Sequence, residues 1–218
     1  ITFLDTSGIK TLGIGLDNYL AQAYRIIDYN NDYYISGLTE NANDYGLIKL
    51  DSLGNILWNR TYGGVASDHC FGMAVGEDGS IFLTGHTLSN TENWDTYTIK
   101  IDRFGNVIWE RVAGNPRGFN PNFIHDEAWD IKCLPDGSCI VVAGTGDEYR
   151  RYTRRCGNDG DNSNTWHVYL IKYDPDGNLE WQKTYGGGQN IDWAGEAIDL
   201  TDENVALNGF TDKHGSFA

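Results

Sequence analysis

Basic residues are scarce in this chain. It holds 16 Lys and Arg against 31 Asp and Glu, which gives a formal net charge of −15. Nucleic-acid binding needs a basic footprint that neutralises phosphates, so nucleic acid is excluded as a partner. Apolar residues come only in short runs, far below the roughly 18 in succession that a membrane-spanning helix needs, so no membrane insertion is predicted. The acidic balance instead favours the self-repelling surface of a soluble secreted protein.

Cysteine is also scarce, with four residues: Cys70, Cys133, Cys139 and Cys156. None of them are spaced as C-x-x-C, which argues against a zinc site or a thioredoxin-like site. Cys133 and Cys139 flank the turn sequence Leu-Pro-Asp-Gly-Ser, so we predict a disulfide across a hairpin, with Cys70 and Cys156 as the remaining pair. Two or four free thiols are the alternative. An even count is typical of an oxidising compartment, which points to an extracellular or cell-surface location.

Glycine is abundant, and part of it belongs to a repeat. The chain has 27 Gly, and the motif D-x-x-G-N-x-x-W occurs three times, at residues 51–58, 102–109 and 174–181. Repetition on this scale indicates an array of one structural unit. Asp and Asn tolerate the left-handed conformation and Gly adopts positive φ freely, so the D-x-x-G-N segment predicts a tight turn between antiparallel strands.

Each unit is predicted to contain four short strands. In the first unit we expect strands at residues 24–27, 33–37, 46–50 and 56–62, and the other units repeat this order. Four-stranded antiparallel sheets at this period are typical of the blades of a β-propeller. We therefore predict an all-β, single-domain β-propeller over residues 1–218, with blades at about 18–64, 68–115 and 126–188. The repeat tryptophans would fill the gaps between neighbouring blades.

A fourth blade is predicted to be divided between the two ends of the chain. Residues 192–218 supply two strands, and residues 1–12 carry D-x-x-G-x-x-x-L, a degenerate copy of the outer hairpin. Joined together, the two segments complete a ring of four blades and remove two open sheet edges. The alternatives are that the chain is part of a larger ring, or that two chains form an eight-bladed ring.

The residues around the repeat carry a family resemblance. W-x-x-T-Y-G-G occupies residues 58–64 and 181–187, and I-K-x-D-x-x-G-N accompanies every turn of the repeat. This pattern resembles the bacterial β-propeller repeat family of secreted and cell-surface proteins, over essentially the whole chain. Members of that family are mostly modules of unknown ligand. The resemblance therefore implies a fold and a location, and it implies no particular activity.

Charged and aromatic residues recur where the first strand of each blade is predicted to begin. They are Asp68, His69, His125, Asp126, Asp192 and Trp193. In a propeller these positions lie near one mouth of the central channel, where they can contact a ligand, and where carboxylates and imidazoles can hold a cation. The alternative is that each Asp accepts backbone N–H bonds at its own turn.

The third blade carries one long insertion, at residues 146–166. Its basic residues are Arg150, Arg151, Arg154 and Arg155. They either bind an acidic group of a ligand or neutralise the acidic surface around them. Asp159, Asp161 and Ser163 supply alternate oxygen ligands as in calcium loops, although the Gly and the distal Glu of an EF-hand are absent. A plain polar loop is the alternative.

These features lead to three hypotheses about function. The first is a non-catalytic, secreted or surface-displayed module that binds a protein or a carbohydrate through one propeller face and the loop at residues 146–166. The second is a metal-dependent enzyme with its site at the channel mouth. The third is a building block of a surface assembly, in which the chain forms a homo-oligomer. No Ser/His/Asp or Cys/His set stands out from the repeat in the sequence.

Overall fold

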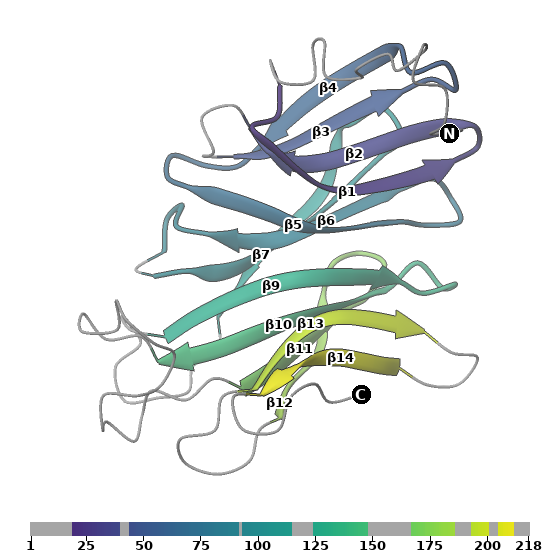
Figure 1. Cartoon of the computed structure of the whole chain (residues 1–218). Coiled ribbons are helices and arrows are strands. Elements are labelled where there is room, and N and C mark those ends of the chain that lie inside the picture. Colours follow the sequence, from purple (N-terminus) through teal and green to yellow (C-terminus); the bar gives the residue numbers. More distant parts are fainter. Residues whose placement is uncertain are drawn as a thin grey trace.

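All regular structure in the described part of the chain is β-strand. The computed structural model describes residues 19–39, 44–91, 93–114, 124–147, 167–185, 193–200 and 205–211. Their strands form three four-stranded antiparallel sheets and one two-stranded sheet, each built from strands that are consecutive in the sequence (Figure 1). The predicted all-β class is confirmed. None of these residues forms a helix with the length and apolar character needed to cross a membrane.

The strands lie where the repeat predicts them. The first sheet contains β1 (Gln22–Tyr29), β2 (Asp32–Leu38), β3 (Tyr45–Leu50) and β4 (Ile56–Tyr62). The second contains β5 (Asp68–Val75), β6 (Ile81–Thr87), β7 (Asp95–Ile101) and β8 (Val107–Ala113). The third contains β9 (Ile124–Cys133), β10 (Cys139–Asp147), β11 (His167–Tyr173) and β12 (Leu179–Tyr185). The two-stranded sheet contains β13 (Trp193–Leu200) and β14 (Val205–Thr211).

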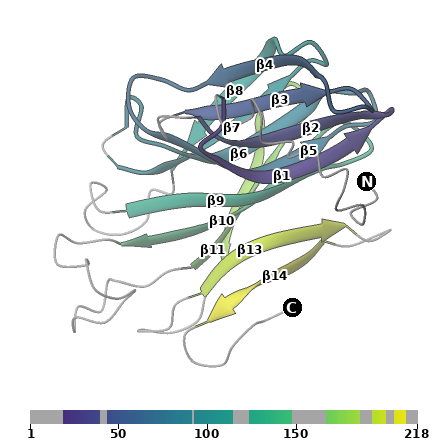
Figure 2. The ribbon, with the colours of Figure 1, turned by 45° about the horizontal axis from the view of Figure 1, so that its top comes forward.

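The first strands of the four sheets form a row, in which β1 contacts β5, β5 contacts β9 and β9 contacts β13. β1, β5, β9 and β13 lie next to one another and run in the same direction (Figures 1 and 2). We call them the inner strands, because the later strands of each sheet lead away from them. Antiparallel sheets stacked face to face around a shared set of inner strands constitute a β-propeller-like fold.

Each repeat turn is fixed by one aspartate. The carboxylates of Asp51, Asp102 and Asp174 each accept the backbone N–H groups of the residues two and four positions further along the chain. They also accept the side-chain amide of the Asn at the fourth position. The hydrogen bonds from this Asn hold the pKa of each Asp carboxyl below its ordinary value. The turn between the third and fourth strands is therefore stabilised within the motif itself.

Apolar side chains fill the spaces between the sheets. The core between the first and second sheets includes Tyr34, Leu47, Met73, Leu83 and Ile99, and that between the second and third includes Phe82, Trp109, Ile131, Val141 and Ile171. Alternate residues of β10 serve opposite faces of its sheet, since Val141 packs in the second core and Val142 in another core on the far side. Burying both faces stabilises each sheet by about 1.5–3 kcal/mol for every large side chain.

The repeat tryptophan of the second sheet joins it to the third. Trp109 is 6% exposed, and its ring packs against Phe82 of its own sheet and Tyr173 of the next. Its Nε1 donates to the carbonyl oxygen of Pro175 at 3.1 Å, within the repeat turn of the third sheet. Arg111 donates to the same turn, at the carbonyl oxygen of Gly177. The predicted role of this tryptophan as filler between sheets is confirmed.

The expected disulfide does not form. Cys133 and Cys139 are cross-strand partners in the β9–β10 hairpin, as the turn sequence predicts, but both are free thiols. Cys139 is fully buried in the core, whereas the Sγ of Cys133 lies 3.4 Å from the carbonyl oxygen of Leu134. The two side chains are thus directed to different partners. Cys70 is also a free, buried thiol, and Cys156 lies outside the described residues.

Trp109→Ala is expected to lower the free energy of unfolding by about 3–5 kcal/mol, because the loss of a large buried ring leaves a cavity between two sheets. Trp109→Phe is expected to cost about 1–2 kcal/mol, since it removes chiefly the hydrogen bond to Pro175. Urea unfolding measures both values. The exposed Phe104 provides a control, and Phe104→Ala should stay within about 0.5 kcal/mol of the wild type. Equal losses for Trp109→Ala and Phe104→Ala would contradict the role of Trp109 between the sheets.

Candidate functional site

Two of the predicted mouth residues, Asp68 and Asp126, are buried where one sheet meets the next. Asp68 is fully buried, and its Oδ2 accepts the backbone N–H of Gly64 at 2.6 Å and the hydroxyl of Ser89 at 3.0 Å. Asp126 is 1% exposed, and its backbone N–H donates to the carbonyl oxygen of Trp94. Asp68 therefore stabilises the turn between β4 and β5. This agrees with the alternative that each Asp accepts backbone N–H bonds at its own turn.

The described residues do not assemble the expected cation site. Among them, no three His, Cys, Asp or Glu side chains are placed so that they could hold a metal ion together. Two neighbouring carboxyls, those of Asp44 and Asp95, have raised pKa values. Burial and the charge of Asp68 raise the pKa of Asp44, and burial raises the pKa of Asp95. Asp68, His69, His125 and Asp126 thus do not form a metal centre with each other.

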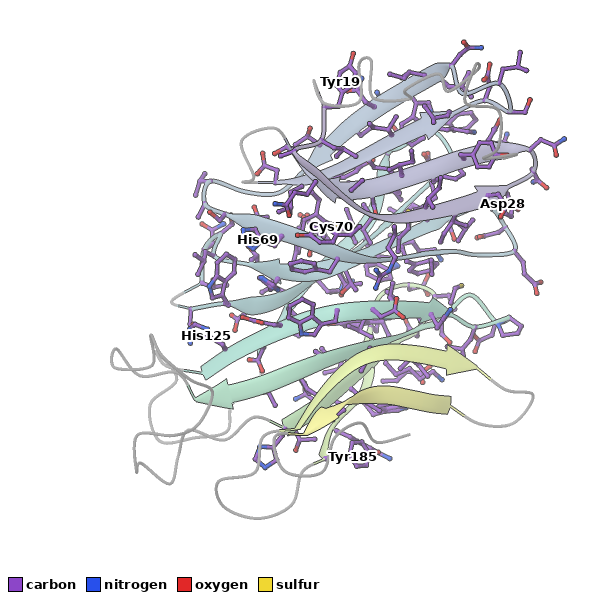
Figure 3. All side chains as sticks on the ribbon, viewed as in Figure 1. Tyr19, Asp28, His69, Cys70, His125 and Tyr185 are labelled. Carbon is purple, nitrogen blue, oxygen red and sulfur yellow. The ribbon has the colours of Figure 1, made fainter. Side chains whose placement is uncertain are left out.

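Most of the other predicted site residues fall outside the described part of the chain. They are Asp192, the insertion arginines Arg150, Arg151, Arg154 and Arg155, and the calcium-like set Asp159, Asp161 and Ser163. Trp193 is the first residue of β13, for which the backbone is described. His69 and His125 are both placed, and they lie at the same end of β5 and β9 (Figure 3).

A β-bulge interrupts every inner strand at a corresponding place. The strand pairing skips one residue in each case, and the skipped residues are Tyr24 in β1, Phe71 in β5, Trp129 in β9 and Glu196 in β13. A bulge bends its strand and re-aims a side chain, which is why bulges gather near functional sites. Three of the four bulged residues are aromatic, although they belong to three different sheets.

A repeat glycine makes room for this bulge in the second sheet. Gly85 of β6 is paired with Cys70, next to the bulged Phe71. A Cβ on Gly85 would lie 1.7 Å from the carbonyl oxygen of His69, a distance that excludes any side chain. Gly37 stands in the same relation to the carbonyl oxygen of Gln22 beside the bulge of β1. Both glycines are therefore required for the close approach of the two strands.

The three aromatic bulge residues form one row across the inner strands, which we call the bulge row. The ring centroids of Tyr24 and Phe71 are 4.8 Å apart, and those of Phe71 and Trp129 are 4.7 Å apart. These are contact distances for tilted aromatic pairs. Tyr24 is 37% exposed, and Phe71 and Trp129 are partly exposed. The row thus presents a continuous aromatic surface at the centre of the molecule.

Two histidines and a tryptophan extend this surface, and we call them the histidine layer. His69 of β5 and His86 of β6 are cross-strand partners with ring centroids 5.1 Å apart. Trp94 packs against both, at 4.8 Å from His69 and 4.7 Å from His86. His86 also contacts Phe71 at 5.1 Å, which joins the layer to the bulge row.

His86 is the buried centre of the histidine layer. It is 3% exposed, and within the described residues its Nδ1 is a buried atom with no hydrogen-bond partner. Burial, together with the smaller effects of the nearby His69 and His125, lowers the pKa of His86 to about 3. The imidazole is therefore neutral at physiological pH and packs as an aromatic ring.

A polar pair borders the bulge row. The guanidinium of Arg25, next to Tyr24 in β1, reaches β9 and donates to the carbonyl oxygen of Trp129 at 3.4 Å. Its Nε lies 4.0 Å from the carboxylate of Asp130. The Arg25 side chain is 39% exposed and that of Asp130 is 13% exposed. Partly exposed polar groups beside an aromatic surface are the combination that orients a ligand in a binding site. By contrast, burial raises the pKa of the nearby Cys70 thiol to about 12, which leaves it protonated and unreactive.

The chain was compared with protein families, curated sequences and solved structures, and only solved structures match it. No protein-family profile and no curated protein sequence matches the chain. Among solved structures, it is similar to the β-propeller domain of the Trilobed protease from Pyrococcus furiosus, which is described as having an open velcro topology. The identity is 10% and the TM-score is 0.35, and the match covers 90% of this chain and 56% of that one. It is also similar to a mutant of Synechocystis apocarotenoid oxygenase, with 14% identity and a TM-score of 0.44 over 88% of this chain and 50% of that one. The chain spans about half the length of each.

The stability of the protein is expected to fall in mild acid because of His86. The folded-state pKa lies below the ordinary value of 6.5, so the unfolded state binds more protons between these two pH values. Stability is therefore complete above pH 6.5 and is lost as the pH falls toward 3. Urea unfolding measures the free energy of unfolding at pH 7 and at pH 5. The decrease between these two pH values should be larger in the wild type than in His86→Phe, by about 1–2 kcal/mol. Equal losses in the two proteins would contradict the neutral, buried state of His86.

Proposed function

We propose that this chain is a non-catalytic binding module of the β-propeller class, displayed outside the cell or on its surface, and that its ligand is a protein or a carbohydrate. The ligand contacts the bulge row and the exposed side of the histidine layer. The polar pair of Arg25 and Asp130 orients it. This proposal agrees with the resemblance to secreted and cell-surface β-propeller repeats.

The observation that supports this function is the partial exposure of the bulge row. Tyrosines that serve the cores between sheets are buried, with Tyr34 at 1% and Tyr45 at 0% exposure, whereas Tyr24 is 37% exposed. Contiguous exposed aromatic surface is unfavourable in water and marks interaction sites. Aromatic side chains also supply large contact areas at a low cost in conformational entropy, which suits them to ligand binding.

Two titratable groups near the bulge row, Asp68 and His86, support binding rather than catalysis. The Oδ2 of Asp68 is held by its turn, its Oδ1 is buried, and His86 is held neutral by burial. A general base needs a pKa near the working pH and access to its substrate, and neither group meets both conditions. Four residues of the metal-dependent alternative, Asp68, His69, His125 and Asp126, form no group of three that could hold a metal ion among the described residues, and its fifth residue, Asp192, lies outside them.

The proposal includes a ring of four blades, closed by both termini. Tyr62 at the end of β4 is 8% exposed and donates to the carbonyl oxygen of Gly105, in the turn of the next sheet. The equivalent Tyr185 at the end of β12 is 48% exposed. In the closed ring, the D-x-x-G turn at residues 5–8 occupies the corresponding place beside Tyr185.

The binding site can be tested by removing its rings. A glycan array and a panel of purified surface proteins identify a ligand, and titration calorimetry then measures its affinity. The double variant Phe71→Ala/Trp129→Ala should weaken binding by about 10- to 100-fold, because aromatic anchors dominate such interfaces. Phe104→Ala removes an exposed aromatic residue from an outer turn and should leave the affinity unchanged. Unchanged binding by a folded double variant would refute the proposed site.

The closed ring can be tested by mass and by truncation. Light scattering coupled to size exclusion should give the mass of one chain, 24.3 kDa. Deletion of residues 1–12 should lower the unfolding temperature, because it exposes the edge strand and side chains of the last sheet. A mass of two chains that does not depend on residues 1–12 would support the eight-bladed, two-chain alternative instead.

A further inference from the structure

Exposed apolar side chains recur on the outer side of the first two sheets. In each sheet they belong to the turn between the third and fourth strands and to the first two residues of the fourth strand. We call these six side chains the apolar rim, and their exposed fractions lie between 39% and 79%: Leu53, Ile56, Leu57, Phe104, Val107 and Ile108. Together they amount to an apolar surface on the order of 500 Å², a size of patch that often marks an interaction site.

The repeat itself does not require apolar residues at these positions. Leu57 and Ile108 are skipped in the pairing of the third and fourth strands, and the skipped residue of the third sheet is Glu180. The turn position of Phe104 is held in the third sheet by the exposed Asp176. The fold therefore accepts an acidic side chain at both positions, and packing does not explain why the first two sheets carry apolar residues there.

The rim residues of the two sheets approach each other, because the turn of the second sheet lies against the fourth strand of the first. The hydroxyl of Tyr62 in β4 donates to the carbonyl oxygen of Gly105 at 3.0 Å. A Cβ on Gly105 would lie 2.8 Å from the Cγ of Arg60, so this turn and β4 are in direct contact. Phe104 precedes Gly105 in the chain, and Leu57 lies on the same strand as Arg60. The two sets of rim residues therefore meet beside Arg60.

Arginine side chains border the apolar rim in a chain that is otherwise strongly acidic. The guanidinium of Arg103 lies 4.7 Å from the ring centroid of Phe104, and Arg60 and Arg103 are both exposed. Residues 51–62 hold one acidic and one basic residue, and residues 102–113 hold two of each, so neither segment adds to the net charge of −15. The acidic side chains of these segments all accept hydrogen bonds from within the molecule. The arginines thus give the rim a local preference for carboxylates.

We propose that the apolar rim binds an extended segment of a partner protein that carries apolar and acidic side chains. The apolar side chains of this segment pack on the rim, and its carboxylates pair with Arg60 and Arg103. β4 and β8 are the last strands of their sheets, so one edge of each backbone faces outward and can pair with a further strand. The rim is a second surface, and its partner is distinct from the ligand of the bulge row.

Two other occupants fit the rim less well. A second copy of the chain would bring together two molecules that each carry a charge of −15, and the rim is smaller than the roughly 800 Å² per partner of a standard stable interface. A lipid surface would cover the outer edges of β4 and β8 without offering hydrogen bonds to their backbone groups, which is unfavourable. An extended protein segment needs only a small contact area and can satisfy those backbone groups.

A displayed library of random peptides, about ten residues long, is the probe. Selection on the wild type should enrich peptides that combine apolar residues with Asp or Glu. The variant Leu57→Glu/Ile108→Glu places at both skipped positions the residue that the third sheet already carries, and urea unfolding verifies that it is folded. Fluorescence anisotropy should show that it binds the most enriched peptide about tenfold more weakly than the wild type does.

Two further variants serve as control and as independent test. Leu179→Glu makes the same kind of change at a 50% exposed residue of the third sheet, outside the rim, and should keep the wild-type affinity. Arg103→Gln leaves every apolar side chain in place and should weaken binding about two- to fivefold, as expected for the loss of an exposed ion pair. The peptide should still bind Phe71→Ala/Trp129→Ala, which distinguishes the rim from the bulge row.

Several results would overturn the proposal. They are the absence of enriched peptides, enrichment of Lys or Arg in place of Asp and Glu, and equal binding by the wild type and Leu57→Glu/Ile108→Glu. Binding to phosphatidylcholine vesicles that this variant abolishes would assign the rim to a lipid surface instead. A mass of two chains by light scattering that the same variant reduces to one would assign the rim to a second copy.

Discussion

The constraint on which this structure depends is that each sheet has two apolar faces, and neither can remain in water. Val141 and Val142 are neighbours in β10, yet they pack in different cores on opposite sides of their sheet. A sheet of this kind is stable only between two others, because burial of apolar area is the main favourable term in folding. Stacking one repeat on the next satisfies the requirement, and it brings the inner strands together at the centre.

This arrangement separates residues that serve the repeat from residues that are free to vary. The outer turns and their tryptophans recur because every junction between sheets presents the same packing problem, as the bonds of Trp109 to the Pro175 turn illustrate. The bulged positions of the inner strands do not have to fill the same space at every junction between sheets, so their side chains can differ. Tyr24, Phe71, Trp129 and Glu196 differ in chemistry while their backbone positions correspond. Variation at fixed positions on a rigid scaffold is how one fold comes to present a specific surface.

The sequence predicted the parts of the fold that depend on local chemistry. The turns at Asp51, Asp102 and Asp174 could be predicted because their hydrogen bonds lie within five residues, and the strands follow from those turns. The cross-strand pairing of Cys133 with Cys139 could also be predicted from the turn between them. The prediction of a disulfide between them was wrong. Strand pairing fixes only the backbone, whereas the side chains are fixed by the burial of Cys139 and by the contact of Cys133 with a backbone carbonyl.

The candidate site was harder to predict because its residues meet only through tertiary packing. His69 was singled out as a residue near the channel mouth, but its partners, His86 in β6 and Trp94 just before β7, carry no shared motif. The bulge row depends on a pairing register that a sequence pattern does not reveal. One signal was present: a small residue precedes each bulged position, as Cys70 precedes Phe71 and Ala128 precedes Trp129.

The central claim is that the bulge row is the surface that meets the ligand, and the indole N–H resonances of the tryptophans test it most directly. In a titration with the tightest ligand found on the glycan array or in the panel of surface proteins, the Trp129 resonance should shift and saturate. The resonances of Trp58 and Trp109, which pack between sheets, should not move. Saturable binding that leaves Trp129 unshifted while other tryptophans respond would contradict the account.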